Sequence, residues 1–419
     1  MLCRSVLGVG LLALSLQVGC SDATTGDVSD VGEVTREDSS EANEAAAPHP
    51  KAVVAPKTDV LLAALTAAAE DNAPLPAAKD DKDKDKNKKK VEAARVAQDA
   101  LDLSEALKAS ALRAQVDGNG KPVVLDFFGR YLTDAGLAKL KGQVTLQQLY
   151  LDQQEGITDI GLEHLKGLTA LRTLSLSETS IGDSNLEALS TLKALQQLNL
   201  SGTRVTSAGL EHIKTLTALV ELKLAQSPVT DAGMAHLKPL TNLQRLDLAN
   251  TEVGSAGLEA LVGLKLQELH LEGTRVTDAG LGHLKAMTSL RWLELSAGIG
   301  DSGLEAIKPL TGLVRLNVGG SGTISDVGID HLKVLTALQR LDLSGTGLTD
   351  TGLLSLKVLS NLQHLNLAET GITDSGLRHL RGLAKLRELD LTGTRMRSGA
   401  IRQLRAALPN CQIVGVTDG

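Results

Sequence analysis

A segment of about 24 residues recurs along most of this chain, and no other feature restricts the possible fold as strongly. Residues 195–213 align without a gap with residues 362–380. Equivalent leucines open successive units 23 to 25 residues apart, at positions 146, 171, 195, 219, 243, 266, 290, 313, 338, 362 and 386. An earlier, degenerate unit contains Leu125, Phe127, Leu132 and Gly136. We therefore count twelve repeats followed by a terminal strand around residues 412–416, which predicts a solenoid.

Inside each unit the spacing of the apolar residues changes halfway. Leu198 and Leu200 are two residues apart, as in a short strand, whereas Leu210, Ile213 and Leu216 recur every third residue, as on one face of a helix. Each unit is therefore expected to be a strand, a turn and a short helix. None of these units can bury its apolar side chains alone, so neighbouring units must stack into one continuous core.

Composition supports many small, equivalent cores over one ordinary globular core. Aromatic residues make up only 1% of the chain, so large rings are too scarce to fill a core of this size. Stacked strands lie about 4.8 Å apart, while helices cannot approach closer than about 8–10 Å. The strands must then occupy the shorter arc. We expect an α/β horseshoe with a parallel sheet on its concave face and short helices on its convex face.

Two polar positions in the unit are predicted to bond the backbone. Thr277 or Asp278 is placed to accept a backbone N–H at the start of its helix. A threonine also recurs in the turn after the strand, where we expect its hydroxyl to bond buried turn backbone between neighbouring units. These threonines are Thr203, Thr251, Thr274, Thr346, Thr370 and Thr394.

The patterns Leu-x-x-Leu-x-Leu and Thr-Asp-x-Gly-Leu-x-x-Leu resemble bacterial leucine-rich repeats of the ribonuclease-inhibitor-like superfamily, of the GALA-like or cysteine-containing subclasses. The resemblance covers about seven tenths of the chain. It implies a leucine-rich repeat solenoid that binds proteins through its concave sheet. Some relatives are ubiquitin-ligase substrate adaptors with an F-box. Residues 21–120 contain no F-box-like segment, which argues against that role.

The N-terminus is typical of an export signal. Arg4 precedes an apolar run over residues 6–18 that ends in Gly19 and Cys20, so residues 1–19 are predicted to be a signal peptide. Residues 16–20 also resemble a bacterial lipobox, in which Cys20 would carry the lipid anchor, although Gln17 stands where the motif prefers an aliphatic residue. We expect a lipid-anchored protein of the cell envelope. Simple secretion and a cytosolic protein with an apolar start remain as alternatives.

Three segments follow before the repeats. Residues 20–90 are acidic and then rich in Lys and Asp, and they are predicted to be a disordered linker. Residues 91–118 carry one helical apolar stripe and are predicted to be an amphipathic helix that caps the first repeat. The repeat domain is then expected over residues 119–419.

The side chains between the strand leucines should face the concave side, and they include the sole tryptophan. Trp292 is predicted to lie there with Arg291, Glu294, His270 and Arg315. The turn of its unit is shortened at residues 296–299, and the next turn is lengthened at residues 319–324. We expect this irregular rim to be the hot spot for a protein partner. The alternative interpretation is ordinary drift between repeats around an incidental tryptophan.

No catalytic, cofactor-binding or metal-binding residues are predicted. One histidine position recurs in six of the helices, which indicates a property of the repeat and not a catalytic group; the six are His164, His212, His236, His283, His331 and His379. Cys411 is expected to be a small apolar residue of the terminal strand. A net charge of −7 argues against nucleic-acid binding. The expected protein is a monomer without enzymatic activity or cofactor, and an architectural envelope protein without a single partner is the alternative function.

Overall fold

The computed structural model describes residues 113–128 and 132–415. The predicted signal peptide, Cys20, the linker and most of the predicted N-terminal helix lie outside these residues. Among the helices that the structure describes, none is both long and apolar enough to span a bilayer.

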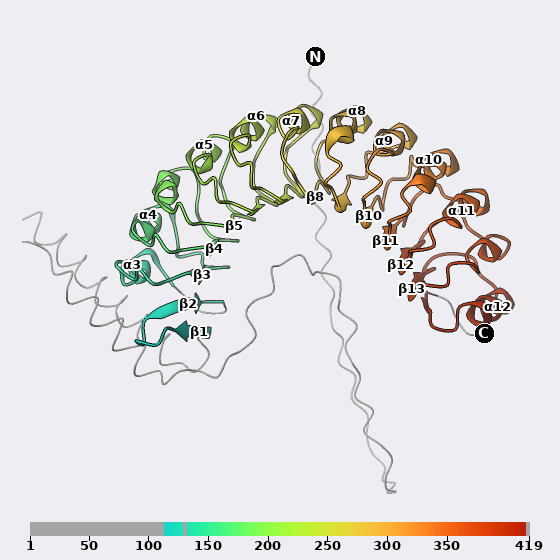
Figure 1. The fold of residues 1–419 in the computed structure, drawn as a ribbon, viewed down its shortest axis with the longest axis horizontal. Coiled ribbons are helices and arrows are strands. Elements are labelled where there is room, and N and C mark those ends of the chain that lie inside the picture. Colours follow the sequence, from blue (N-terminus) through green and yellow to red (C-terminus); the bar gives the residue numbers. More distant parts are fainter. Residues whose placement is uncertain (1–112, 129–131, 416–419) are drawn as a thin grey trace, which may run out of the picture. The chain divides into compact units, whose positions relative to one another are not determined.

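The described residues form an arch with one sheet along its inner side (Figure 1). Its fourteen strands follow the order of the sequence. Strand β1 is antiparallel to β2, and β2 to β14 are parallel. The strands are β1 (Arg113–Val116), β2 (Pro122–Asp126), β3 (Gln148–Tyr150), β4 (Thr173–Ser175), β5 (Gln197–Asn199), β6 (Glu221–Lys223), β7 (Arg245–Asp247), β8 (Glu268–His270), β9 (Trp292–Glu294), β10 (Arg315–Asn317), β11 (Arg340–Asp342), β12 (His364–Asn366), β13 (Glu388–Asp390) and β14 (Gln412–Val414).

Short helices cover the outer side of the arch, so the predicted horseshoe is confirmed. Several of the helices are single 3-10 turns, labelled η. The α-helices are α3 (Asp134–Ala138), α4 (Asp159–Leu162), α5 (Leu210–Ile213), α6 (Asp231–Met234), α7 (Ser255–Glu259), α8 (Asp278–Leu281), α9 (Asp301–Ala306), α10 (Asp326–His331), α11 (Asp350–Leu356) and α12 (Ser398–Ala407). The 3-10 helices are η1 (Glu163–Leu165), η2 (Leu186–Thr191), η3 (Ala235–Leu237), η4 (Gly282–Ala286), η5 (Leu332–Val334) and η6 (Gly376–His379).

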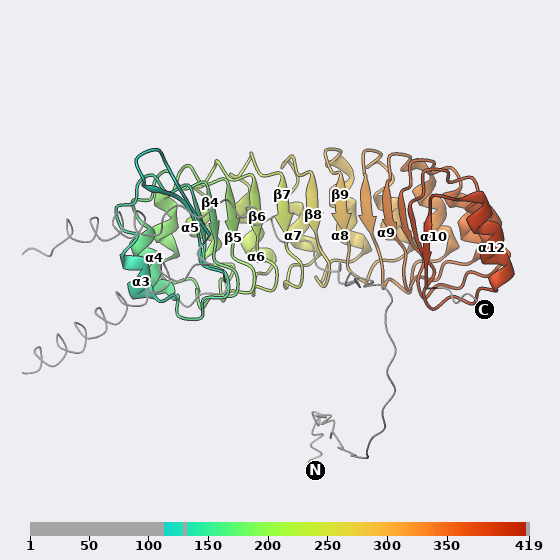
Figure 2. The same cartoon turned by 90° about the horizontal axis from the view of Figure 1, so that it is seen from below.

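The parallel strands pair without any shift in register. Leu198 of β5 pairs with Leu222 of β6, which pairs with Leu246 of β7. Each of these leucines is buried, and one apolar core runs from the first repeat to the terminal strand. Figure 2 shows the strands lying side by side across the concave face. Because the register is constant, equivalent side chains on the concave face form straight columns.

The end of the predicted N-terminal helix is a strand. Residues Arg113–Val116 form β1, and a turn at residues 117–120 joins it to β2. In that turn the Asp117 carboxylate accepts the backbone N–H groups of Asn119 and Lys121 at 2.8 and 2.9 Å. The edge of β2 exposes unpaired backbone groups, and a hairpin strand satisfies them where a helix could not. The prediction of a helix for residues 113–116 was therefore wrong.

The turn threonines bond backbone within their own unit, contrary to expectation, and the hydroxyls of Thr203 and Thr274 also contact serine hydroxyls of the next unit at 3.5 and 2.9 Å. The Thr203 hydroxyl donates to the carbonyl of Leu200 at 2.6 Å, and Thr251 bonds Leu248 in the same way at 2.7 Å. Where serine replaces threonine, the hydroxyl reaches the preceding unit: Ser227 donates to the Leu200 carbonyl at 2.9 Å. A threonine hydroxyl thus closes its own turn, and serine at this position joins two units.

Aspartates at the helix starts join successive units, which sequence reasoning did not predict. The Thr277 hydroxyl accepts no N–H of α8 and instead lies 3.1 Å from the Ser255 hydroxyl of the preceding unit. Asp278 accepts the N–H of Gly300 in the following unit at 2.8 Å. Asp301 accepts both the N–H and the hydroxyl of Ser325, at 2.7 and 2.6 Å. The same inter-unit bonds to backbone N–H groups are made by Asp134, Asp159, Asp183, Asp231, Asp326, Asp350 and Asp374.

Candidate functional site

Polar side chains in two columns line the concave face, one at the first and one at the third residue of each strand. Many of them bond one another across strands. Arg245 and Lys223 both contact the buried Glu221 carboxylate, at 2.8 and 3.4 Å. His364 lies 2.9 Å from the Glu388 carboxylate. These pairs hold the surface in one arrangement before any partner arrives, which lowers the entropy lost on binding.

Trp292 lies at the first position of β9 between two groups that contact its ring. The Arg315 guanidinium of β10 lies over the ring, 4.5 Å from its centroid. The His270 ring of β8 meets it edge to face, with centroids 4.6 Å apart. A cation over an indole face is attracted by the ring's electron density. Three adjacent strands therefore build one stacked cluster, and Trp292 keeps part of its surface exposed.

Glu294 connects this cluster from the third position of β9. Its carboxylate contacts His270 Nδ1 at 2.7 Å and accepts the Trp292 indole N–H at 3.0 Å. Burial acts to lower the pKa of His270, but Glu294, Asp247 and Glu268 outweigh it, so this pKa is raised. Burial acts to raise the pKa of Glu294, but its bonds to His270 and Trp292 and the charges of His270 and Arg315 lower it. The pair is thus charged over a wider pH range than free side chains would be.

Arg291 does not join the cluster, although the sequence placed it there. Its guanidinium donates to the carbonyls of Thr288 and Leu290 at 3.1 and 2.9 Å. Arg291 precedes β9, and its exposed side chain lies beside Gly312 of the next unit. Four of the five predicted residues therefore lie together in one cluster, and Arg291 packs on the edge of the sheet.

The irregular turns interrupt a row of backbone bonds. Along this edge a turn N–H donates to the next turn, as from Asn250 to Glu272 at 2.7 Å and from Gly320 to Ser344 at 2.7 Å. Between these points, within the described chain, Gly273 and Ala297 make no such bond. A hollow of about 620 Å³ opens there and is lined in part by Asn317 and Asp342. Because Asn317 pairs with Glu294, the hollow lies next to the tryptophan cluster.

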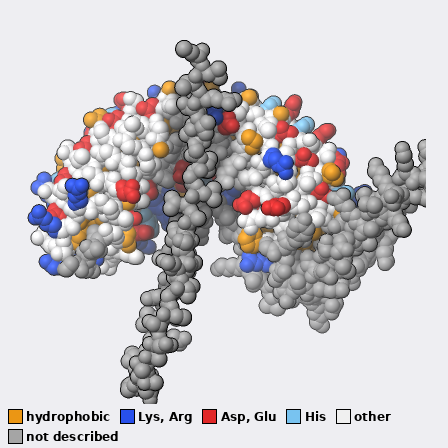
Figure 3. Space-filling view, turned by 180° about the vertical axis from the view of Figure 1, so that it is seen from behind, with side chains coloured by type: hydrophobic (Ala, Val, Ile, Leu, Met, Phe, Trp, Pro, Cys, Tyr) orange, Lys and Arg blue, Asp and Glu red, His pale blue; other side chains and the backbone are white. Residues whose placement is uncertain are grey.

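The recurring histidines lie on the helices of the outer side. His212 is in α5 and His331 is in α10, and Figure 3 shows histidine side chains near the outer rim of the arch. Burial lowers the pKa of His164. Among the described residues, no three His, Cys, Asp or Glu side chains gather closely enough to hold a metal ion. Cys411 is half-buried just before β14, and burial raises the pKa of its thiol to about 11.

One solved structure and one family model agree with this architecture. A search of curated proteins finds no match. The crystal structure of an internalin (inlF) from Listeria monocytogenes is 22% identical in sequence, with a TM-score of 0.55 over 76% of this chain and 95% of that chain. An internalin C2 (inlC2) from the same species is 27% identical, with a TM-score of 0.40 over 46% of this chain and 80% of that chain. The family model of the leucine-rich repeat region matches residues 134–413. The chain therefore belongs to the leucine-rich repeat family.

Proposed function

We propose that this protein is a non-catalytic scaffold that binds a protein partner through its concave face, with the Trp292 cluster at the centre of the contact. The observation that carries the proposal is the stack of Arg315, Trp292 and His270, held by Glu294. Tryptophan and arginine are the residues most enriched in binding hot spots. Here both side chains are fixed by their neighbours, so little rotamer freedom is lost on binding.

Trp292→Ala should weaken binding of an isolated partner about thirtyfold, because a central aromatic anchor contributes about 2 kcal/mol. The partner is first isolated by pull-down from a detergent-solubilised envelope, and its affinity is then measured by calorimetry. Trp292→Phe keeps a ring under Arg315 but removes the hydrogen bond to Glu294. It should therefore weaken binding of the partner less than Trp292→Ala does.

The matched control is Gln197→Ala, in the same column on β5, which should bind like the unchanged protein. Unchanged affinity for the alanine variant at Trp292 would remove this cluster from the contact. A pull-down that yields no stoichiometric partner would instead favour an architectural role.

We also propose that Cys20 carries a lipid that anchors the repeats to the cell envelope, following the lipobox-like residues 16–20. Cells expressing the full chain and fed an alkyne fatty acid should label the protein. Cys20→Ser should abolish the label, because Cys20 is the residue that would carry the lipid. Cys3→Ser, within the same leader, should leave it intact. Equal labelling of the two variants would contradict lipidation at Cys20.

A further inference from the structure

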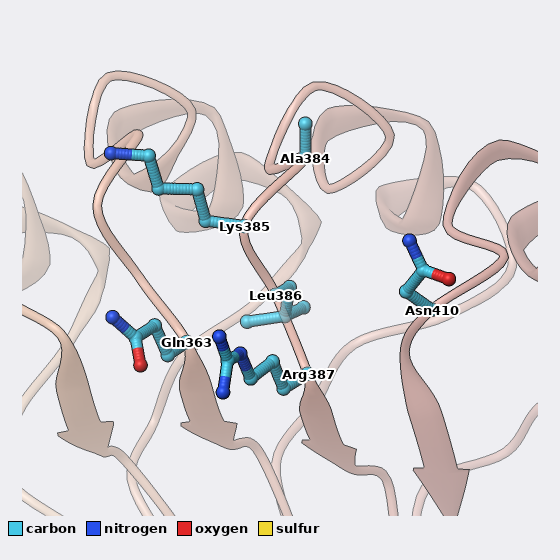
Figure 4. Close-up of a pocket in the computed structure, with 6 residues that line it drawn as sticks. All are labelled: Gln363, Ala384, Lys385, Leu386, Arg387 and Asn410. Carbon is cyan, nitrogen blue, oxygen red and sulfur yellow. The ribbon is translucent and has the colours of Figure 1, made fainter.

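A second hollow opens at the edge of the concave face near the C-terminal end of the solenoid. It encloses about 490 Å³ and is lined by Gln363, Ala384, Lys385, Leu386, Arg387 and Asn410. Gln363 precedes β12, Arg387 precedes β13, and Asn410 lies two residues before β14. Figure 4 shows Gln363 and Arg387 next to each other at the beginning of adjacent strands, while Lys385 reaches toward the preceding unit.

The charge of this hollow is not neutralised by its lining. Arg387 is exposed, and its guanidinium makes no hydrogen bond or ion pair with any residue that the structure describes. Lys385 contacts only a neutral group, the side-chain oxygen of Asn361 at 2.8 Å. The neighbouring carboxylate of Glu388 is bonded to His364. Two cations therefore line the hollow with two amides and no acid.

Cations on β6, β7 and β10 have partners instead. Arg245 and Lys223 both form ion pairs with Glu221, and the Arg315 guanidinium lies over the Trp292 ring. Arg340 of β11 is the exception nearby: it is exposed and makes no ion pair within the described chain. Strands stand about 4.8 Å apart, so Arg340 and Arg387 are about 10 Å apart across the sheet. Arg340 is thus a further cation without an ion pair two strands from the hollow, and the His364–Glu388 pair lies in the same row of the sheet.

We propose that the Arg387 hollow binds a carboxylate side chain of the protein partner. This side chain belongs to an acidic segment of the partner, and the segment lies across β11 to β13. A guanidinium offers two parallel N–H donors to a carboxylate, and the amides of Gln363 and Asn410 add neutral donors at the same opening. The inference rests on the proposed protein-binding function and adds the chemistry of the partner.

Fluorescein-labelled hexaglutamate tests this site directly on the full chain by fluorescence anisotropy. Binding should saturate, and it should weaken as salt rises because the contact is between exposed charges. Arg387→Gln should weaken it about tenfold, the loss expected for one charge-assisted bidentate contact.

Arg172→Gln is the matched control. Arg172 occupies the same place in its unit, just before β4, is also exposed and lies outside the hollow. Equal losses for the two variants, or none, would overturn the proposal and indicate a general charge effect or no contact. Inorganic phosphate that binds where hexaglutamate does not would also overturn it, in favour of a phosphate site.

The outcome is separable from that of the Trp292 experiment. If hexaglutamate does not bind but Trp292→Ala still weakens the isolated partner, the scaffold function stands and the acidic segment is rejected. If hexaglutamate binds and the tryptophan variant keeps full affinity for the partner, the acidic-segment site at the hollow is kept and the Trp292 cluster is rejected as the centre of the contact.

Discussion

Asp301→Ala should lower the free energy of unfolding by about 3 kcal/mol, roughly 1 kcal/mol for each donor left without its acceptor. The Asp301 carboxylate accepts the N–H and hydroxyl of Ser325 and the N–H of Gly328, at 2.7, 2.6 and 3.0 Å. All three donors belong to the next unit, so the substitution removes a bond between units and not within one. Urea unfolding followed by circular dichroism measures the change.

Asp301→Asn is the control for this prediction. The amide oxygen still accepts backbone N–H groups, and its nitrogen can donate to the Ser325 hydroxyl, so a loss of only about 1 kcal/mol is expected. A loss equal to that of the alanine variant would mean that charge, and not hydrogen bonding, carries the contact.

The effect should depend on pH. Burial acts to raise the pKa of Asp301, but its bonds to Ser325 and Gly328 and the charge of His331 outweigh burial, and the pKa is lowered. A group with a lowered folded pKa stabilises above its ordinary pKa and loses that contribution as pH falls through the folded value. The difference in free energy of unfolding between the unchanged protein and Asp301→Ala should therefore be largest at neutral pH. It should become smaller in acid, below about pH 4.

Gly328→Ala should destabilise the fold by about 2 kcal/mol, although alanine normally stabilises a helix by about 1 kcal/mol relative to glycine. A Cβ at Gly328 would overlap Asp301 Oδ1 and stand 3.0 Å from the Asp301 Cα. The carboxylate cannot move aside, because three hydrogen bonds hold it. Thermal unfolding of the purified variant shows whether the change in stability is a loss or a gain.

Gly282→Ala provides the comparison, since Gly282 is helical and a Cβ there meets nothing within 4 Å. That change should be neutral or stabilising. Gly328→Ala should also lower the free energy of unfolding by less when Asp301 is already alanine, because residues in contact have coupled effects. Additive effects, or a stabilising Gly328→Ala, would show that the close approach of helix and carboxylate is not what requires glycine here.

These two residues explain the pattern Thr-Asp-x-Gly-Leu. The aspartate of one unit bonds the start of the next helix, and the glycine of that helix leaves room for the carboxylate. Equivalent overlaps arise at Gly209, Gly257 and Gly352 with Asp183, Asp231 and Asp326. Stability in stacked repeats is a sum of terms within units and between neighbours, and this contact supplies a polar term between neighbours on the helical side.

The candidate site was only partly predictable. The sole tryptophan, the alternation of the strand and the unequal turns pointed to Trp292, His270, Glu294 and Arg315. The side chain of Arg291 was misplaced because the residue before the strand can turn either onto the sheet or toward its own loop, and local spacing does not distinguish the two. The Arg387 hollow gave no sequence signal, since Arg172 and Arg291 occupy the same place in their units.

The spacing of leucines determined the strand, the helix, the number of repeats and the curvature, because period-two and period-three stripes can be buried together only by stacking. Tertiary structure alone decided what the open ends and polar positions do. β1 became a strand because the edge of β2 required backbone partners. The turn threonines closed their own turns, and the helix-start aspartates joined neighbouring units, because those choices depend on distances of a few ångströms between units that no single repeat encodes.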